Sequence, residues 1–279
     1  MSGIRLGLIG DNIALSKAPD LHRLAGRMCG IDVTYDLLVP KDLGPGFEAV
    51  FDGARNEGYR GLNITYPYKE IVLRRLNTKD DSVGLIGSCN TVLFERLGPL
   101  GANTDFSGFL SAYRNSFGIA APGIVALAGC GGVGKAIGFA LAQLGAKDLR
   151  LFDADREKAG SLAASLSANC PSLRVEASAS IYQACESADG LVNCTPLGMA
   201  GQGGSAFPSE LIAGHNWAFD AVYTPIETPF LRGARAAGLS LMSGYELFIG
   251  QGVDAFRLFT GHDIDYRAIR NALKRERAG

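Results

Sequence analysis

Short apolar runs and longer amphipathic stretches alternate along nearly the whole chain. In the first part, the strand-like runs are IRLGLIG (4–10), VTYDLLV (33–39) and GLNIT (61–65). Amphipathic stretches, predicted to be helices, lie near residues 19–29, 46–57 and 67–76. Strands that alternate with helices are typical of α/β proteins with parallel strands. The pattern therefore predicts one α/β unit in roughly the first hundred residues.

This first unit is expected to close with a hairpin. The segment NTVLFERLGPLGANTD (90–105) holds two extended runs on either side of a Gly-Pro pair. Gly-Pro pairs mark turns, and two extended runs joined by a short turn are typical of an antiparallel hairpin. A helix is then expected to begin near Phe106 and to lead away from the hairpin.

A second α/β unit is predicted from GIVALAG (123–129), which is followed by a long helix to about Leu144. Its further strand-like runs are DLRLFD (148–153), LRVEAS (173–178), GLVNCT (190–195), WAFDAVY (217–223) and LSLMS (239–243). The last thirty or so residues read as helical, and we expect them to fold back on the first unit. The first unit would then be discontinuous, over residues 1–105 and 246–279, around an inner unit over residues 106–245.

Composition and charge exclude several classes of protein. The 279 residues include 27 Lys plus Arg and 28 Asp plus Glu, and no long run of like charge, so we expect no nucleic-acid partner. The start of the chain lacks the apolar core of a signal peptide and no stretch reaches about 20 apolar residues, which predicts a cytoplasmic protein with no membrane partner. The six cysteines form no CxxC pair and the three histidines stand far apart, so no metal site is predicted.

A glycine-rich turn, AGCGGVGKAI (128–137), follows a predicted strand and opens a predicted helix. It holds Gly129, Gly131 and Gly134 in GxGxxG spacing, with Gly132 and Val133 before the last of them. Such glycines permit a tight turn, close backbone approach and helix–strand packing, and the helix N-terminus offers N–H groups to a pyrophosphate. A glycine-rich turn can also serve packing alone, but this structural context favours dinucleotide binding.

The position of one acidic residue bears on whether NAD or NADP is preferred as cofactor. Asp153 ends the next predicted strand, nineteen residues past Gly134, where a carboxylate would bind the adenosine ribose hydroxyls. Because a carboxylate repels a 2'-phosphate, NAD is expected as cofactor, with NADP possible because Arg156 follows closely. The alternative is that Asp153 merely caps the next helix, which Asp155 could do by itself.

A single lysine stands where the strand GLNIT ends. Lys69 follows Pro67 at a junction between a strand and a predicted helix, where α/β proteins place ligands. An enzyme that oxidises an alcohol with a nicotinamide needs a group for the hydroxyl proton, and a lysine can take or relay it. Asp105, at the end of the first unit, is the candidate carboxylate partner. A lysine without such neighbours is most often solvated.

Taken together, the motifs resemble those of the shikimate and quinate dehydrogenases over nearly the whole chain. They stand in the family's order: LSKAPDLH (15–22), NITYPYK (63–69), GSCNT (87–91), NTD (103–105), the glycine-rich turn, NCTPLGM (193–199), DAVYTPIET (220–228) and GYELFIGQ (244–251). The resemblance implies an α/β fold of two domains with a cleft between them. The substrate-binding domain would be 1–105 and 246–279, and the Rossmann dinucleotide-binding domain 106–245. The implied reaction is reversible hydride transfer between a nicotinamide and the C3 alcohol or ketone of shikimate or quinate.

The resemblance also implies roles for individual residues, in a monomer or a homodimer acting on a small-molecule substrate. Lys69 and Asp105 are similar to the family's catalytic pair. Positions similar to the family's substrate-binding residues are Ser16, Asn63, Thr65, Asn90, Tyr223 and Gln251. Positions similar to its cofactor-binding residues are Gly129, Gly131, Gly132, Val133, Gly134, Asp153, Thr195, Met199 and Gly244. FDADRE resembles the NAD-using branch, because Ala154 stands where the NADP-using branch has an arginine.

The chain departs from the family at the first motif. The family usually has two hydroxyl residues two positions apart on the substrate carboxylate, and this chain has Ser16 but Ala18. Losing one hydrogen bond to a charged group costs roughly 1.5 to 3 kcal/mol. Three alternatives stay open: a related cyclic polyol acid as substrate, a nucleotide-binding sensor without turnover, and another enzyme on this scaffold, such as a methylene-tetrahydrofolate or an aminoshikimate dehydrogenase.

Overall fold

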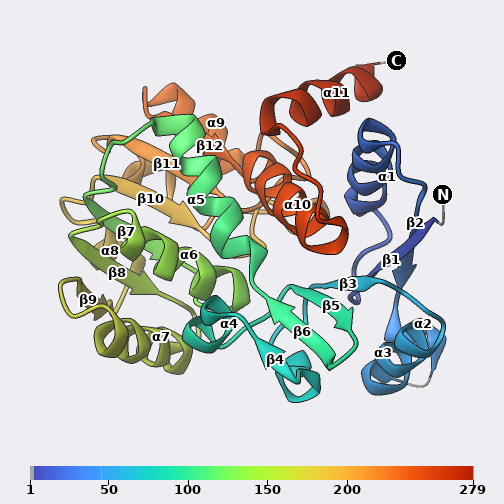
Figure 1. Ribbon diagram of the computed structural model, residues 1–279. Coiled ribbons are helices and arrows are strands. Elements are labelled where there is room, and N and C mark those ends of the chain that lie inside the picture. Colours follow the sequence, from blue (N-terminus) through green and yellow to red (C-terminus); the bar gives the residue numbers. More distant parts are fainter. Residues whose placement is uncertain (1–2, 45, 279) are drawn as a thin grey trace. The chain divides into compact units, whose positions relative to one another are not determined.

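The computed structural model describes residues 3–44 and 46–278 and divides the chain into two compact units (Figure 1). Unit 1 comprises Met1–Gly108 and Ile249–Gly279, and unit 2 comprises Phe109–Phe248. Both divisions fall inside a helix, within α5 (Thr104–Phe117) and within α10 (Gly244–Thr260). Each therefore lies three residues beyond the predicted boundaries at 105 and 245.

Unit 1 is built on a mixed sheet with the strand order β2-β1-β3-β5-β6-β4. Its strands are β1 (Ile4–Ile9), β2 (Val33–Leu38), β3 (Gly61–Ile64), β4 (Thr78–Lys79), β5 (Thr91–Glu95) and β6 (Gly98–Ala102). β1 pairs in parallel with β2 and β3, whereas β5 pairs antiparallel with β3 and β6. The parallel half is the predicted α/β unit, and the antiparallel half is the predicted hairpin.

The turn of the hairpin differs from the prediction. Glu95 pairs with Gly98, so Arg96 and Leu97 form a two-residue turn and the Gly-Pro pair begins β6. Gly98 has a φ of +114°, which only glycine adopts readily. The glycine therefore shapes the first position of the returning strand and not the turn itself.

The helices of unit 1 pack against this sheet or against one another. They are α1 (Ala18–Cys29), α2 (Pro40–Leu43), α3 (Gly46–Asn56), α4 (Asp81–Ile86), α11 (Tyr266–Ala278) and the unit 1 parts of α5 and α10. The side chains of Phe51, Leu62 and Val92 lie together in one fully buried cluster between α3 and the sheet. In Figure 1, the C-terminal α11 lies beside α1, where Arg27 Nη2 is 2.5 Å from Glu276 Oε1.

The helix predicted over residues 67–76 is wrong in its first half. Only Ile71–Arg75 is helical there, as a short 3₁₀ helix (η1). Before it, the Tyr68 N–H donates to Thr65 O and the Lys69 carbonyl accepts from Cys89 N, both at 2.8 Å. These bonds hold the backbone in a turn. The Lys69 carbonyl accepts from Cys89, twenty residues further along the chain, and not from an N–H of a following helical turn.

Unit 2 is built on a parallel sheet with the strand order β12-β11-β10-β7-β8-β9. Its strands are β7 (Ile124–Ala128), β8 (Asp148–Phe152), β9 (Arg174–Ala177), β10 (Gly190–Asn193), β11 (Trp217–Asp220) and β12 (Ser240–Ser243). Its other elements are α6 (Gly132–Gln143), α7 (Arg156–Asn169), α8 (Ile181–Cys185), η2 (Ser209–Leu211) and α9 (Pro229–Ala236). This is the Rossmann order, and the order reverses between β7 and β10. Ligands of such sheets bind outside the carboxyl ends of the strands at that reversal.

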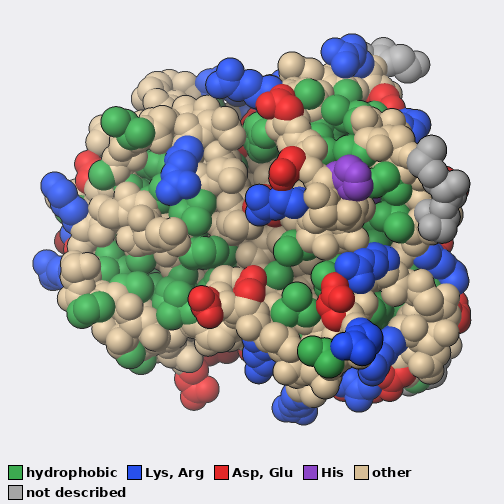
Figure 2. Space-filling model, in the orientation of Figure 1, with side chains coloured by type: hydrophobic (Ala, Val, Ile, Leu, Met, Phe, Trp, Pro, Cys, Tyr) green, Lys and Arg blue, Asp and Glu red, His purple; other side chains and the backbone are tan. Residues whose placement is uncertain are grey.

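The distribution of charge and the character of the helices bear on possible partners. On the face drawn in Figure 2, positively and negatively charged side chains lie interspersed. Across residues 3–44 and 46–278, no helix combines the length and the apolar character needed to span a membrane.

Candidate functional site

The lysine and the aspartate predicted as catalytic form an ion pair. Lys69 Nζ lies 2.5 Å from Asp105 Oδ2, and their side chains are only 13% and 9% exposed. Lys69 stands in the turn after β3, and Asp105 stands in the first turn of α5, directly after β6. Removal of either partner would leave the other charge nearly buried and unpaired, which is costly. The fold of unit 1 thus holds both side chains together.

A buried set of hydrogen bonds fixes the start of α5. Asn90 Oδ1 accepts from Thr104 N at 2.7 Å and from Thr104 Oγ1 at 3.2 Å, and Thr91 Oγ1 lies 3.0 Å from Thr104 Oγ1. Because Thr104 immediately precedes Asp105, these bonds fix the backbone that carries the carboxylate. The Asn90 amide nitrogen has no acceptor among the described residues, so it has hydrogens to offer to a ligand.

Asn63 has both ends of its amide engaged within the protein. Its Oδ1 accepts from the Tyr35 hydroxyl at 2.9 Å, and its Nδ2 donates to Thr91 Oγ1 at 3.1 Å and to Asn90 O at 3.4 Å. At 6% exposed, Asn63 connects β3 to the segment that holds α5 in place. Its contacts therefore bear on the orientation of Asn90 and Thr91.

Two residues that sequence reasoning missed anchor the lysine turn. The Tyr68 hydroxyl donates to Asp11 Oδ1 at 2.7 Å, and the Tyr68 ring stacks on Phe47 at 4.8 Å between centroids. Burial, with the bond to Asp11, raises the pKa of Tyr68 to about 12, so the hydroxyl stays protonated and continues to donate at neutral pH. The residue next to Lys69 is thereby held to the loop that follows β1.

The remaining predicted substrate residues of unit 1 lie at the ends of its elements. Ser16 precedes α1, and its Oγ accepts from Ala18 N at 3.3 Å. Thr65 is half-buried directly after β3. Gln251 lies on α10 where that helix touches α5, since a Cβ built on Gly108 would be 2.4 Å from Gln251 N.

The glycine-rich turn lies between β7 and α6, at the reversal of strand order in unit 2. Gly129 has a φ of +95°, and a Cβ built there would be 2.7 Å from the Cys194 carbonyl carbon. A Cβ on Gly134 would be 1.9 Å from Gly129 O, whereas one on Gly131 would have no atom within 4 Å. Gly129 and Gly134 therefore serve close packing, and Gly131 leaves open space beside the N-terminus of α6. Gly132 and Val133 form the first turn of that helix.

Asp153 is tied to this turn and does not cap the next helix. Its Oδ2 accepts from Cys130 N at 2.7 Å, and its Oδ1 accepts from Asp155 N at 2.9 Å. The cap of α7 is Asp155, whose side chain accepts from Glu157 N, so the capping alternative for Asp153 is wrong. A carboxylate has about four lone-pair positions, so Asp153 retains acceptor capacity beside the glycine-rich turn.

The other predicted cofactor residues also belong to unit 2, as does Tyr223, which was predicted to bind the substrate. Thr195 and Met199 lie in the loop after β10. Tyr223 follows β11, and its ring stacks on Phe248 at 5.0 Å between centroids. Gly244 begins α10, and a Cβ there would be 2.4 Å from Ala221 O, so the position requires glycine for packing.

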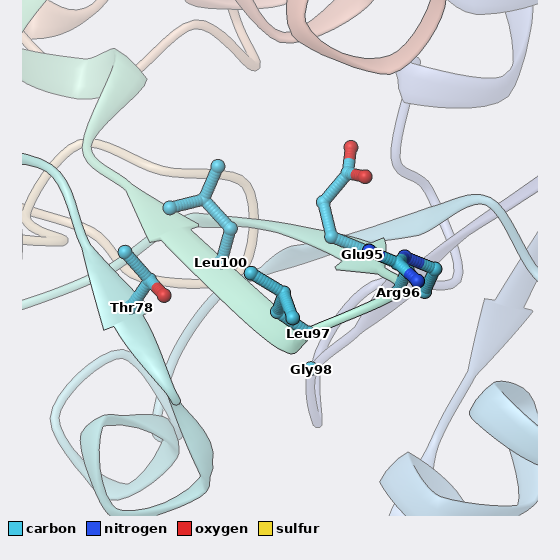
Figure 3. A pocket seen from close by; sticks show the side chains of 6 residues that line it. All are labelled: Thr78, Glu95, Arg96, Leu97, Gly98 and Leu100. Carbon is cyan, nitrogen blue, oxygen red and sulfur yellow. The ribbon is translucent and has the colours of Figure 1, made fainter.

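A pocket of about 340 Å³ lies elsewhere, beside the β5–β6 hairpin. It is lined by Thr78, Glu95, Arg96, Leu97, Gly98 and Leu100 (Figure 3). Figure 3 shows the side chains of Leu97 and Leu100 both projecting from the hairpin. None of the predicted site residues lines this pocket, so it has no part in the chemistry considered for Lys69 and Asp105.

Two family models match the chain. The shikimate dehydrogenase substrate-binding domain matches residues 8–92, which hold Ser16, Asn63, Lys69 and Asn90. The shikimate 5'-dehydrogenase C-terminal domain matches residues 244–274, which hold Gln251.

Relatives that match over nearly their whole length are also shikimate or quinate dehydrogenases. The chain is 39% identical over 271 residues to a shikimate dehydrogenase (NADP(+)) of Pseudarthrobacter chlorophenolicus, covering 95% of this chain and 92% of that protein. It is 37% identical over 273 residues to a quinate/shikimate dehydrogenase (NAD(+)) of Corynebacterium efficiens, covering 96% of each. The structure of quinate dehydrogenase from Corynebacterium glutamicum in complex with NAD superposes with a TM-score of 0.89 at 35% identity, covering 97% of this chain and 98% of that one. The chain therefore belongs to the shikimate and quinate dehydrogenase family of NAD(P)-dependent oxidoreductases.

Proposed function

We propose that the protein interconverts the C3 alcohol and ketone of shikimate or quinate, with NAD as the preferred cofactor. The observation that carries the proposal is the nearly buried ion pair of Lys69 and Asp105. An ammonium held at a fixed position can donate a proton to a ketone oxygen, and a neutral amine can accept the proton of an alcohol. The pair thus offers a single acid–base group for both directions of the reaction.

Each residue of unit 1 around this pair has its own role in the proposed reaction. Lys69 moves the hydroxyl proton, and Asp105 holds the lysine and accepts a hydrogen bond from the reacting hydroxyl. Asn90 offers its amide hydrogens to a ring hydroxyl, and Ser16 offers its hydroxyl to the carboxylate. A bound nicotinamide supplies or accepts the hydride. Preorganised donors and acceptors of this kind lower the barrier because they need not rearrange during the reaction.

The fit of a dinucleotide to unit 2 rests on the glycine-rich turn and on Asp153. Gly131 leaves open space next to the N-terminus of a twelve-residue helix, α6, where a pyrophosphate would be stabilised. The Asp153 carboxylate is fixed by two backbone N–H groups. The relatives divide between NADP and NAD in their names, so the preference of this chain is proposed from Asp153.

Removing the charge of Asp153 is expected to shift cofactor preference towards NADP. Two unit charges about 4 Å apart interact by roughly 1 to 4 kcal/mol in the range from water to a protein surface. Asp153→Asn should therefore raise the ratio of kcat/KM for NADP to that for NAD by about tenfold or more. Initial rates with both cofactors measure this ratio.

Asp155→Asn is the matched control for that change. Asp155 lies two residues after Asp153, carries the same charge and caps α7. A ratio unchanged in Asp153→Asn, or raised equally in Asp155→Asn, would contradict the role given to Asp153.

Restoring a second hydroxyl in the first motif is expected to improve carboxylate binding. Ala18 is the first residue of α1, and its N–H already donates to Ser16 Oγ. Ala18→Ser should lower KM for shikimate or quinate by about tenfold with kcat little changed, because it adds one hydrogen bond to a charged group. Ala14→Ser, in an exposed position of the same segment, is the control. An unchanged or higher KM in Ala18→Ser would favour a related cyclic polyol as substrate.

The reaction itself is tested with four initial-rate assays that pair shikimate or quinate with NAD or NADP. Faster turnover with NAD than with NADP on either acid is the expected result. Binding of NADH without turnover of either acid would overturn the proposed substrates and leave the cofactor site standing.

A further inference from the structure

A fully buried carboxylate in unit 2 has no part in the chemistry described so far. Asp220 ends β11 and is 0% exposed, and no described lysine, arginine or histidine forms an ion pair with it. Burial raises the pKa of Asp220 to about 6, so the group is ionised at neutral pH. A buried charge without a cation is costly unless hydrogen bonds satisfy it, so its partners indicate what it is for.

The first partner leads to the loop after β10. Asn193 is the cross-strand neighbour of Asp220, and its Nδ2 donates to Asp220 Oδ1 at 2.9 Å and to Leu197 O at 3.2 Å. Its Oδ1 accepts from Thr195 N at 2.9 Å and from Thr195 Oγ1 at 2.7 Å. Asn193 is itself 0% exposed, and the Asp220 carboxylate fixes the orientation of its side-chain amide. All other hydrogen bonds of that amide are with Thr195 or Leu197.

The other two partners hold the segment after β11. Asp220 Oδ1 also accepts from Val222 N at 3.0 Å, and Oδ2 accepts from Thr228 Oγ1 at 2.6 Å. Thr228 in turn caps α9 through Leu231 N. The Asp220 carboxylate therefore joins the loop after β10, the segment that leads to Tyr223, and the start of α9. All of these lie at the carboxyl ends of β10 and β11.

We propose that Asp220 is a positioning residue for the cofactor, which fixes the Thr195–Met199 loop and the Val222–Tyr223 segment in the arrangement that receives the nicotinamide half. The proposal rests on the proposed function, because that function places a nicotinamide dinucleotide in unit 2, where Thr195 and Met199 are similar to cofactor-binding positions of the family and Tyr223 to a substrate-binding one. Asp220 acts through Asn193 and the backbone and need not touch the cofactor. A residue that served stability alone would affect the fold without changing cofactor affinity selectively.

Asp220→Asn is the main test variant, because it keeps the size of the side chain. An asparagine has one acceptor oxygen and one donor nitrogen, so it cannot accept from all three donors of Asp220. We expect the dissociation constant for NADH, titrated by its own fluorescence, to rise about tenfold, as befits the loss of a hydrogen bond to a charged group. KM for NAD should rise in step, with KM for the acid within twofold.

A matched control lies in the same sheet. Asp148 begins β8, at the opposite edge from the carboxyl ends, and is a buried carboxylate at 4% exposed. Asp148→Asn should lower the melting temperature without changing the dissociation constant for NADH by more than twofold. A second pair of variants tests the hydrogen bond from Thr228 to Asp220 separately from the stability of the fold. Thr228→Val should weaken NADH binding several-fold. Thr228→Ser retains the hydroxyl and should bind NADH as the wild type does.

Amide hydrogen exchange tests the positioning without any ligand. In Asp220→Asn, peptides covering residues 190–200 and 217–228 should exchange about tenfold faster, and the same peptides in Asp148→Asn should exchange at the wild-type rate. Unchanged exchange, or NADH affinity within twofold of wild type in folded Asp220→Asn, would overturn the role of Asp220. Faster exchange in a protein whose wild type binds no NADH would instead overturn the proposed function and leave Asp220 as an organiser of these loops only.

Discussion

Lys69→Met is expected to lower kcat about 10³-fold, within the range of roughly 10² to 10⁴ that a general acid–base group contributes. Methionine keeps much of the length of the side chain but cannot carry a proton, so the alcohol proton loses its acceptor in the oxidation and the ketone loses its donor in the reduction. The dissociation constant for NADH should stay within about twofold, because the glycine-rich turn and Asp153 belong to the other unit. Initial rates and NADH titration of the same preparation measure both.

The controls separate loss of chemistry from loss of fold. Lys79→Met removes an exposed lysine of the same unit, on β4, and should retain wild-type rates. Because Lys69→Met leaves the Asp105 carboxylate nearly buried and unpaired, it should also destabilise the protein. Adding Asp105→Asn should restore stability and leave the rate low. A Lys69→Met protein that keeps more than about a tenth of the wild-type kcat would show that the proton travels by another route.

Most of the secondary structure could be predicted from the sequence, because period and composition are local properties. The strand predicted over 190–195 is β10 at Gly190–Asn193, shorter only because Cys194 and Thr195 already belong to the turn at its end. The helix predicted over 67–76 failed for a non-local reason. Its apolar spacing was adequate, but the Lys69 carbonyl is bonded to Cys89 N, a partner that no local window contains.

The same distinction applies to the functional groups. Lys69 and Asp105 could be proposed as partners because each lies in a motif with a recognisable pattern, and the structure places them 2.5 Å apart. No sequence pattern predicts the hydrogen bond from Tyr68 to Asp11 or the one from Asn193 to Asp220. They join positions 57 and 27 residues apart, and their physical signal is the burial of a polar group, which the sequence does not display.

Gly134→Ala is expected to destabilise the unliganded protein, whereas Gly131→Ala is expected to leave its stability nearly unchanged. A Cβ on Gly134 would be 1.9 Å from Gly129 O, a backbone atom that cannot rotate away, so β7 and α6 must separate. Overpacking of this kind costs about 1 to 3 kcal/mol or more, and we expect a clearly lower melting temperature with NADH binding weakened at least about a hundredfold. Thermal unfolding and NADH titration measure the two effects.

Gly131→Ala isolates cofactor binding from packing. A Cβ on Gly131 meets no atom within 4 Å, and its φ of −77° suits any residue, so the melting temperature should change little. The added methyl would occupy the open space beside the N-terminus of α6, and NADH affinity should fall about tenfold or more if a pyrophosphate lies there. If the glycine-rich turn served packing alone, Gly131→Ala would bind NADH as tightly as the wild type does. The two glycines thus decide between the two roles that the sequence motif left open.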